Sequence, residues 1–374
     1  MKVLFACGGT GGHINPALAV AGYIKEKEPE SVIAFVGNKT GMEATLVKKA
    51  GYKFYPIKVA GFQRGLTPKK LMNDVRAVGL AVSAGKDIKK ILSEFKPDVV
   101  MGTGGYVSGP VLRKAHKMGY KTATHEQNAY PGITTKMLSR YVDTVMLAMP
   151  QAKRYLPERI YVDTGNPVRL SVIKAKKESS RKALGLDERP MILSYGGSLG
   201  AKRINEVMAD VIAEDLKDGK YRHFHAMGSY GAKWMPELLK SKGVDISDEN
   251  LKLYEYIDNM DVMMSAADLV ICRSGAITLS ELEVQGKPSI LIPSPNVAEN
   301  HQYHNAMTLV ERGAAAIIEE KDLTPERLKG EIDRLLSDGE ELLKMSVAAK
   351  KMAVINSNER IFRALKQLAK NKRL

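Results

Sequence analysis

Three glycine-rich segments stand at positions in the chain where anion-binding chemistry is expected. They are Gly8–Gly12, Gly104–Gly109 and Gly196–Gly200, and each follows a short apolar run. Glycine lets the backbone approach a ligand closely, and a helix that begins after such a turn presents free N–H groups to an anion. We therefore predict diphosphate binding, with ordinary tight strand–helix turns as the alternative. None of the three has the spacing of a nicotinamide-binding fingerprint or of an ATP-hydrolysing P-loop.

Two further segments carry polar groups suited to a nucleotide and a sugar. In Cys272–Glu281, Ser274 is a predicted N-cap, and Glu281 lies one turn beyond the phosphate end, where a carboxylate can accept ribose hydroxyls. In Ala298–Asn305, Gln302 offers both a donor and an acceptor to adjacent sugar hydroxyls. The alternatives are a solvated helix residue for Glu281 and a simple helix start for Gln302.

Candidate proton acceptors lie at the ends of two apolar runs. His13 follows the first glycine turn, and a histidine can take a proton from a sugar hydroxyl near neutral pH. His125 and Glu126 are rival bases, unless they only orient the acceptor. A lone histidine is more often structural, so the sequence leaves the choice of base open among these three residues.

The elements that must position these residues form two series of strands alternating with helical patterns. This alternation predicts parallel βαβ units, so we expect an α/β fold with two similar doubly wound domains. The predicted strands of the first series are Val3–Cys7, Val32–Val36, Val99–Gly102, Lys121–His125 and Val142–Leu147. Those of the second are Met191–Ser194, Leu269–Cys272, Ser289–Ile292 and Ala315–Ile318.

The join between the two series is expected near Gly165-Asn166-Pro167, which gives domains 1–164 and 165–357. Ligands of doubly wound sheets sit outside the carboxyl ends of the strands, so we expect a site in a cleft between two facing sheets. The basic, amphipathic tail 358–374 has Ile361, Phe362, Leu365 and Leu368 as its candidate buried face.

Composition narrows the class of partner. The 374 residues carry a formal net charge of +15, which indicates an anionic partner. Zinc-finger spacings and RNA-binding aromatic motifs are absent, so nucleic acid is disfavoured. Cys7 and Cys272 are expected to be buried, reduced thiols. No signal peptide or spanning apolar stretch is recognised, so we expect a cytoplasmic protein.

A basic, amphipathic region suggests how such a protein could reach a membrane. Residues 66–96 interleave lysines and an arginine with leucines, valines and an isoleucine. Such a segment can lie on an anionic leaflet, and the alternative is a solvated helix face whose apolar side is buried. We predict peripheral docking on the cytoplasmic face of the cell membrane.

Taken together and in their order, these segments resemble the MurG family of glycosyltransferases, which is part of glycosyltransferase family 28. The motifs are Gly8–His13 followed by Pro16, Gly104–Pro110, His125–Asn128, Gly165–Arg169, Gly196–Ser198 and Cys272–Glu281. The resemblance covers nearly the whole chain. It implies the GT-B fold, with two Rossmann-like domains and a C-terminal helix that crosses back to the first.

The resemblance implies UDP-N-acetylglucosamine (UDP-GlcNAc) as the sugar donor. The Ile257 backbone would meet the uracil and Glu281 the ribose. The implied diphosphate contacts are Ser198, Ala276, Ile277 and Thr278. The sugar contacts would be Gln302 and Asn128, with Arg169 toward the nucleotide and Thr10, Gly11 and Gly12 closing over the donor. His301 stands where the family often has a first glutamine, so no sugar contact is assigned to it.

The implied acceptor is undecaprenyl-diphospho-N-acetylmuramoyl-pentapeptide, called lipid I, and the product is lipid II of peptidoglycan synthesis. Its pyrophosphate would meet Gly104, Gly105, Tyr106 and Ser108. An α-linked donor and a β-1,4-linked product imply inversion by a single displacement. No Asp-x-Asp motif occurs, so we expect no metal and no cofactor.

Three other functions remain open from the residues. One is another GT-B UDP-sugar transferase that acts on a glycolipid, and the second is a UDP-GlcNAc 2-epimerase, which needs no membrane face. The third is a basic nucleic-acid-binding protein, which would bind with steep salt dependence and without UDP-sugar affinity.

Overall fold

The chain folds into two α/β units, each built around its own parallel sheet. The structure is a computed structural model that describes residues 1–59 and 84–370. One unit comprises Met1–Val168 together with the chain from Asn356 onward, and the second comprises Arg169–Ile355. The boundary therefore lies between Val168 and Arg169, rather than at the expected 164–165.

In the described part of the first unit, the sheet has the order β3-β2-β1-β4-β5-β6-β7, with every neighbouring pair parallel. Its strands are β1 Lys2–Ala6, β2 Val32–Asn38, β3 Lys53–Ile57, β4 Val99–Gly102, β5 Lys121–Glu126, β6 Thr144–Leu147 and β7 Val162–Asp163. Its helices are α1 Gly11–Lys27, α2 Met42–Lys49, α4 Gly105–Lys117, α5 Ile133–Leu138, the 3-10 helix η1 Pro150–Tyr155 and α16 Ser357–Lys370.

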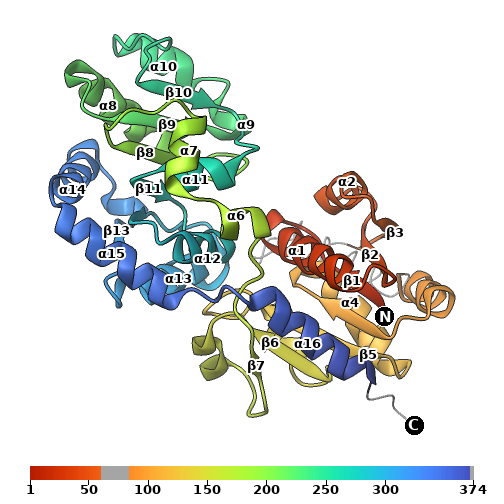
Figure 1. The fold of residues 1–374 in the computed structure, drawn as a ribbon. Coiled ribbons are helices and arrows are strands. Elements are labelled where there is room, and N and C mark those ends of the chain that lie inside the picture. The colour runs from red at the N-terminus through yellow and green to blue at the C-terminus, as the bar shows by residue number, and fades with distance from the viewer. Residues whose placement is uncertain (60–83, 371–374) are drawn as a thin grey trace. The chain divides into compact units, whose positions relative to one another are not determined.

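Helices cover both faces of this sheet (Figure 1). On one face α1 and α16 pack together, with α16 over β4 and β5, and Ile361, Leu365 and Leu368 of α16 are buried in that core. On the opposite face α4 and the helical residues 84–95 close a second core with Ile88 and Leu92. The buried face expected for the tail is thus present at these three positions.

The region expected to dock on a membrane is described only in part. Residues 60–83 lie outside the described residues, and so does most of the basic amphipathic segment 66–96. In the helical remainder, Ile88 and Leu92 are fully buried while Lys86, Lys89 and Lys90 are exposed. The apolar side of this remainder therefore belongs to the protein core, which was the alternative interpretation.

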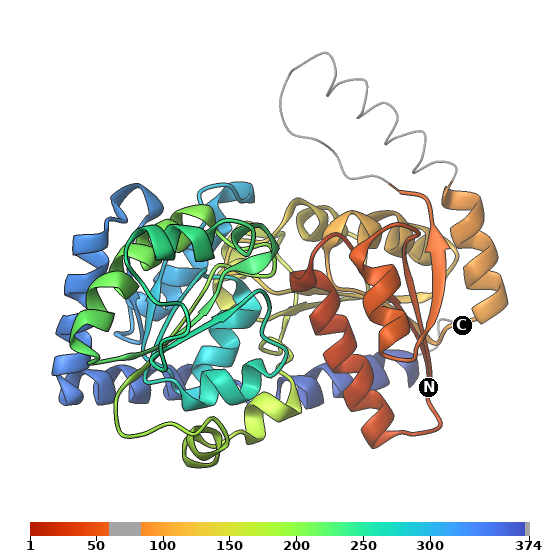
Figure 2. The same cartoon turned by 90° about the horizontal axis from the view of Figure 1, so that it is seen from above.

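The second unit repeats the plan with the strand order β10-β9-β8-β11-β12-β13, again parallel throughout the described residues. Figure 2 shows the strands and helices of this unit, coloured green to blue, from above. Its strands are β8 Met191–Tyr195, β9 Arg222–Ala226, β10 Leu251–Tyr254, β11 Leu269–Cys272, β12 Ser289–Leu291 and β13 Ala316–Ile317. Its helices are α6 Leu170–Lys174, α7 Lys177–Ala183, α8 Lys202–Asp218, α9 Gly228–Gly231, α10 Met235–Ser241, α11 Met260–Ala266, α12 Ala276–Gln285, α13 His301–Val310, α14 Pro325–Ser337 and α15 Gly339–Met352, with 3-10 turns η2 Ala298–Asn300 and η3 Glu320–Asp322.

Both strand orders contain a topological switch point, where ligands of doubly wound sheets bind. In the first unit the order reverses between β1 and β4, and in the second between β8 and β11. The three glycine-rich turns follow β1, β4 and β8, and Cys272–Glu281 begins at the end of β11. The fold thus brings the predicted motifs to the carboxyl ends of the strands on either side of each switch point.

Candidate active site

At the switch point of the first unit, the turns after β1 and β4 are packed into one another. A Cβ on Gly105 would lie 2.1 Å from the carbonyl oxygen of Gly8, and a Cβ on Gly104 would lie 2.6 Å from Cδ2 of His13. Gly104 and Gly105 also have φ angles of +103° and +74°, which favour glycine. Thr103 Oγ1 completes the contact by donating to the carbonyl of His13 at 2.7 Å. The two turns therefore form one continuous surface.

His13 lies in the first turn of α1, at this junction. Its side chain is half-buried, and its Nδ1 is 3.3 Å from Oγ1 of Thr10, the residue that precedes the helix. Gly11 and Gly12 form the start of the same helix, where backbone N–H groups point along the helix axis toward the N-terminus. The predicted residues Thr10, Gly11, Gly12 and His13 thus lie together with Gly104 and Gly105.

A buried carboxylate, which the sequence analysis missed, supports the first turn from below. Glu43 of α2 is fully buried, and its Oε1 accepts the Asn38 N–H at 2.8 Å while its Oε2 accepts the Gly9 N–H at 3.4 Å. Three glycines leave room for it, since a Cβ on Gly8, Gly37 or Gly41 would come within 2.4 Å of its atoms. The coincidence of these glycines around one glutamate is visible only in three dimensions.

Tyr106 and Ser108 hold the second turn in place. Tyr106 accepts a hydrogen bond from Asn38 Nδ2 at 3.3 Å. Ser108 is fully buried, and its Oγ accepts the Gly104 N–H at 3.1 Å and lies 2.8 Å from the carbonyl oxygen of Ala6. The Ser108 hydroxyl is therefore bonded inside the turn, where Gly104 is also buried, whereas Gly105 and Tyr106 are partly exposed.

His125 and Glu126 at the end of β5 are both buried and bonded to the protein. His125 Nε2 is 3.0 Å from the carbonyl oxygen of Gly165, and its Nδ1 is 3.1 Å from Gln127 Nε2. Burial lowers the pKa of His125 to about 4, so its ring is neutral near pH 7. The Glu126 carboxylate accepts N–H groups of Asn128 and Gly132. This geometry suits positioning of Asn128 better than proton abstraction.

The glycine turn after β8 begins the candidate site of the second unit. Gly197 and Gly200 have φ angles of +96° and +84°, and Ser198 at the tip is exposed. The turn rests against the segment after β9, where Ser229 N–H donates to the Ser198 carbonyl and Tyr230 N–H donates to the Leu199 carbonyl, both at 3.2 Å. The backbone around Ser198 is therefore held from outside the turn.

The neighbouring turn after β11 brings α12 and α13 together. The N-cap of α12 is Gly275, so the expected cap at Ser274 is wrong: its Oγ instead donates to the Gln302 carbonyl at 2.8 Å. Gln302 Oε1 accepts the Ser294 N–H at 2.9 Å, which leaves its amide N–H groups as the part suited to a ligand. Ala276, Ile277 and Thr278 form the first turn of α12 beside it.

Glu281 lies one turn further along α12 and pairs with Arg169. Arg169 Nη2 is 3.4 Å from Glu281 Oε1; the arginine side chain is 48% exposed and the glutamate residue 8%. Burial raises the pKa of Glu281, and Arg169 partly opposes that rise. Ile257, in the loop between β10 and α11, is also buried at this edge of the sheet. These residues form a site that can take an anion at the α12 N-terminus and hydroxyls at the carboxylate.

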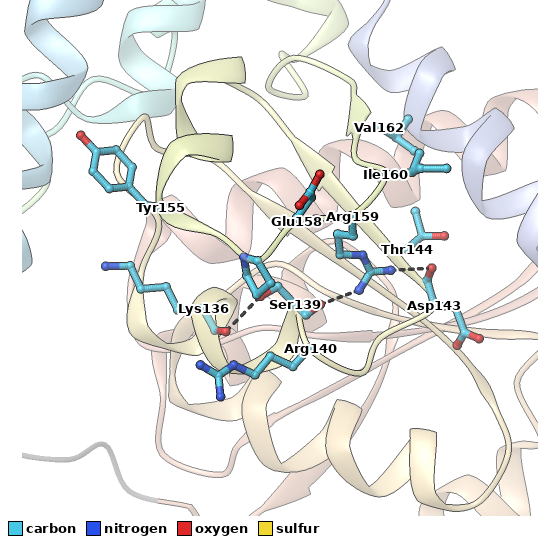
Figure 3. Close-up of a pocket in the computed structure, with 11 residues that line it drawn as sticks. Lys136, Ser139, Arg140, Asp143, Thr144, Tyr155, Glu158, Arg159, Ile160 and Val162 are labelled. Carbon is cyan, nitrogen blue, oxygen red and sulfur yellow. Dashed lines mark hydrogen bonds between the residues drawn. The ribbon is translucent and has the colours of Figure 1, made fainter.

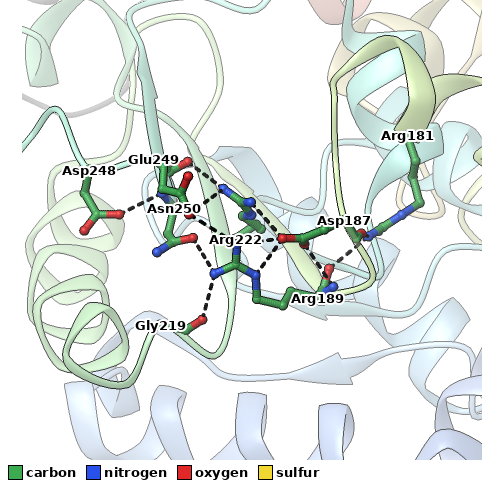
Figure 4. Close-up of polar contacts among 8 residues, drawn as sticks. All are labelled: Arg181, Asp187, Arg189, Gly219, Arg222, Asp248, Glu249 and Asn250. Atoms are coloured by element: carbon green, nitrogen blue, oxygen red, sulfur yellow. Dashed lines mark hydrogen bonds and ion pairs between the residues drawn. The ribbon is translucent and has the colours of Figure 1, made fainter.

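Two other features lie apart from the predicted residues. A hollow of about 1000 Å³ in the first unit is lined by α5, β6 and the η1–β7 segment, with Arg159 donating to the Ser139 and Asp143 carbonyls (Figure 3). In the second unit Asp187, Arg189 and Arg222 form an ion-paired network at the amino ends of β8 and β9 (Figure 4). Both arginines hold the pKa of Asp187 well below its usual range, and this network stabilises the edge opposite the site.

The described ranges offer no cluster of side chains that could bind a metal ion. Among residues 1–59 and 84–370, no group of three or more histidine, cysteine, aspartate or glutamate side chains is placed to hold a metal ion. The expectation of metal-independent chemistry remains a prediction.

Comparison with known proteins agrees with this arrangement. Residues 3–147 match the glycosyltransferase family 28 N-terminal domain, and residues 191–361 match the family 28 C-terminal domain. The UDP-N-acetylglucosamine–N-acetylmuramyl-(pentapeptide) pyrophosphoryl-undecaprenol N-acetylglucosamine transferase of Acetivibrio thermocellus is 42% identical over 100% of this chain and 99% of that protein.

Two solved structures have the same fold. The crystal structure of Acinetobacter baumannii MurG superposes with a TM-score of 0.77 at 29% identity, covering 98% of this chain and 99% of that one. CalG4, the calicheamicin glycosyltransferase, reaches a TM-score of 0.69 at 14% identity, covering 99% and 98%, which shows the fold alone.

The chain has two parallel doubly wound sheets with glycine turns at their switch points. Together with these matches, this architecture defines a glycosyltransferase of the GT-B fold. The expected fold is thereby confirmed. The chain belongs to glycosyltransferase family 28 and, within it, to the MurG family.

Proposed function

We propose that this enzyme transfers N-acetylglucosamine from UDP-GlcNAc to the C4 hydroxyl of the N-acetylmuramoyl residue of lipid I, which gives lipid II for peptidoglycan synthesis. The observation that carries the proposal is the 42% identity, over the full chain, to a transferase named for this donor and this acceptor. The glycolipid transferase and the epimerase would share the fold, so the fold alone favours neither of them.

The donor is assigned to the second unit. The diphosphate is placed at the N-terminus of α12, contacting Ala276, Ile277 and Thr278, with Ser198 of the glycine turn beside it. A helix start suits this role because its backbone N–H groups and the helix dipole both favour negative charge. Glu281 accepts the ribose hydroxyls, the Ile257 backbone meets the uracil, and Arg169 lies toward the nucleotide. The Gln302 amide N–H groups bind the sugar.

The acceptor is assigned to the first unit. Gly104, Gly105 and Tyr106 offer their turn to the acceptor pyrophosphate, and Ser108 keeps the turn in shape from inside. Thr10, Gly11 and Gly12 are assigned to the sugar donor on the resemblance, together with Asn128, which the Glu126 carboxylate orients. We assign the role of base to His13 because its side chain is half-buried, whereas His125 and Glu126 are buried.

The reaction is a single in-line displacement. The acceptor C4 oxygen bonds to the anomeric carbon as the bond from that carbon to the diphosphate oxygen breaks. His13 takes the hydroxyl proton, and the electron pair leaves with UDP, whose new charge is stabilised by the α12 N–H groups. The anomeric configuration inverts, and no covalent enzyme intermediate forms.

Peripheral docking on the cytoplasmic face of the cell membrane follows from a polyprenyl acceptor and a net charge of +15. None of the helices in the described ranges is both long enough and apolar enough to cross a bilayer.

The test is to incubate the pure protein with labelled UDP-GlcNAc and a short-chain lipid I analogue, then to separate the products. Transfer of label into a β-1,4-linked disaccharide supports the proposal. Epimerised UDP-sugar without transfer would favour the epimerase, and transfer only to other glycolipids would favour the second transferase class.

A further inference from the structure

Three buried polar side chains cross the core of the second unit behind the glycine turn. Ser194 lies on β8, His225 on β9 and Asn205 on α8, and each is at most 1% exposed. Ser194 Oγ is 2.7 Å from His225 Nδ1, and His225 Nε2 is 3.2 Å from Asn205 Oδ1. Asn205 Nδ2 continues the chain to the Met227 carbonyl at 2.8 Å.

The Met227 carbonyl fixes the direction of every hydrogen bond in this series. The Met227 carbonyl can only accept, so Asn205 must present its amide nitrogen there and its oxygen to His225. His225 therefore carries its proton on Nε2, and its Nδ1 accepts from the Ser194 hydroxyl. Burial lowers the pKa of His225 to about 3, so the ring keeps this neutral tautomer across the physiological range.

The Met227 carbonyl is in turn the support of the glycine turn after β8. A Cβ on Gly200 would lie 2.1 Å from Met227 O, and a Cβ on Gly228 would lie 2.0 Å from Gly200 N. Two hydrogen bonds join the same segments, from Ser229 N–H to Ser198 and from Tyr230 N–H to Leu199. A shift of the Met227 peptide therefore displaces the backbone that carries Ser198.

We propose that Ser194, His225 and Asn205 form a positioning relay that holds the Gly196–Gly200 turn in the shape required by the donor diphosphate. The relay touches no substrate and acts only through the Met227 carbonyl. This inference rests on the proposed function for the identity of the ligand, but the holding of the turn does not depend on it.

The chain offers a matched control on the same two elements. His223 is also fully buried on β9 and also pairs with α8, through Asp215 Oδ2 at 2.9 Å, but it lies at the end of β9 remote from the turn. His225→Phe and His223→Phe each replace a buried ring by another ring, but the first removes two side-chain hydrogen bonds and the second removes one. Only the first breaks the relay.

Two readouts test the proposal. Hydrogen exchange without ligand should show the Ser229 and Tyr230 amides exchanging about tenfold or more faster in H225F than in H223F. The loss of a buried hydrogen bond typically shifts a local opening equilibrium by about this factor. Titration with UDP should give a dissociation constant raised by about tenfold in H225F and little changed in H223F. His225→Gln, which can still donate to Asn205, should recover part of both effects.

The outcomes separate the relay from the proposed function. Equal exchange and equal UDP affinity in folded H225F and H223F would overturn the relay. Faster exchange in H225F with no UDP binding by the wild-type protein would overturn the proposed function and the link to the diphosphate, while the holding role stands. If H225F does not fold, Ser194→Ala takes its place, with effects in the same direction but smaller because only the far end of the relay is lost.

Discussion

The Glu43 carboxylate lies directly beneath Gly8: a Cβ added to Gly8 would be 2.4 Å from Glu43 Oε1. The inner side of the first glycine turn is thus in contact with the Glu43 side chain. This carboxylate accepts two backbone N–H groups, from Gly9 and from Asn38. Glycine at position 8 is therefore required for contact with this side chain.

Replacing Glu43 by Gln should destabilise the first unit. One of the two N–H groups would then face an amide NH₂ in place of an acceptor, and an unsatisfied buried donor costs about 1–3 kcal/mol. Denaturant unfolding measures the change. Glu26→Gln on α1, where the side chain is 48% exposed, is the control and should stay within about 0.5 kcal/mol of wild type. Equal stability of the two variants would contradict the supporting role.

His13→Ala and His125→Ala should have opposite signatures. Loss of a general base lowers kcat by about 10²–10⁴-fold, so H13A should keep its melting temperature and lose turnover. H125A removes a buried ring that bonds to Gly165 and Gln127, so it should lose stability first. Turnover and thermal melting of both variants provide the measurement. Turnover of H13A within several-fold of wild type would exclude His13 as the base.

Two glutamates of α12 allow the nucleotide assignment to be tested within one helix. Glu281→Gln should weaken UDP binding by about tenfold, because the carboxylate is the proposed acceptor for both ribose hydroxyls. Glu283→Gln is the control: it is as buried as Glu281, at 8% exposed, but no ligand contact is assigned to it. Calorimetric titration with UDP should show the difference, and equal affinities would remove Glu281 from the site.

Glu283 itself should make stability depend on pH. Burial raises its pKa to about 8, against the opposing effect of Arg312. The folded state therefore holds this proton more tightly than the unfolded state. Its contribution to stability is fully present below the unfolded-state pKa near 4.5 and is lost as pH rises through about 8. The free energy of unfolding should fall more steeply over this interval in wild type than in E283Q, by up to about 1.4 kcal/mol per pH unit. Parallel dependences of the unfolding free energy on pH in wild type and E283Q would contradict the raised pKa of Glu283.

Gly105→Ala should cost more than Gly119→Ala, although both glycines have positive φ angles, of +74° and +83°. At Gly119 nothing lies within 4 Å of an added Cβ, so the cost is the backbone strain of about 1–2 kcal/mol. At Gly105 the added Cβ would meet the Gly8 carbonyl, which adds about 1–3 kcal/mol of overpacking. Chemical unfolding of the two variants measures the difference, and similar losses would mean that the turns can separate freely.

The fold and the places of the motifs could be predicted because they depend on local patterns. Apolar runs, glycine turns and helical spacing are all contiguous in the sequence. The strands β3, β7, β9 and β10 were missed, and β9 shows why: its residues 222–226 read Arg-His-Phe-His-Ala, and the two histidines are fully buried through pairing with α8. A polar side chain that is buried by a distant partner gives no apolar signal.

The same limit applies to the candidate site. Thr10, Gly11, Gly12 and His13 could be proposed because they are consecutive, and Ala276 to Glu281 because they share one predicted helix. Glu43, Asn205 and His225 were missed because each acts across a gap of many residues. The cap at Ser274 was wrong because the Gln302 carbonyl, 28 residues away, competes for that hydroxyl.

The place of α16 in the first unit has a consequence for biosynthesis. Ile361, Leu365 and Leu368 complete the core formed with α1, so this core stays open on the ribosome until the whole of Arg169–Ile355 has been made. At about 5–20 residues per second, this interval lasts on the order of ten to forty seconds. During that time the second unit can fold, while the first keeps an exposed apolar surface beside α1 that a chaperone can bind.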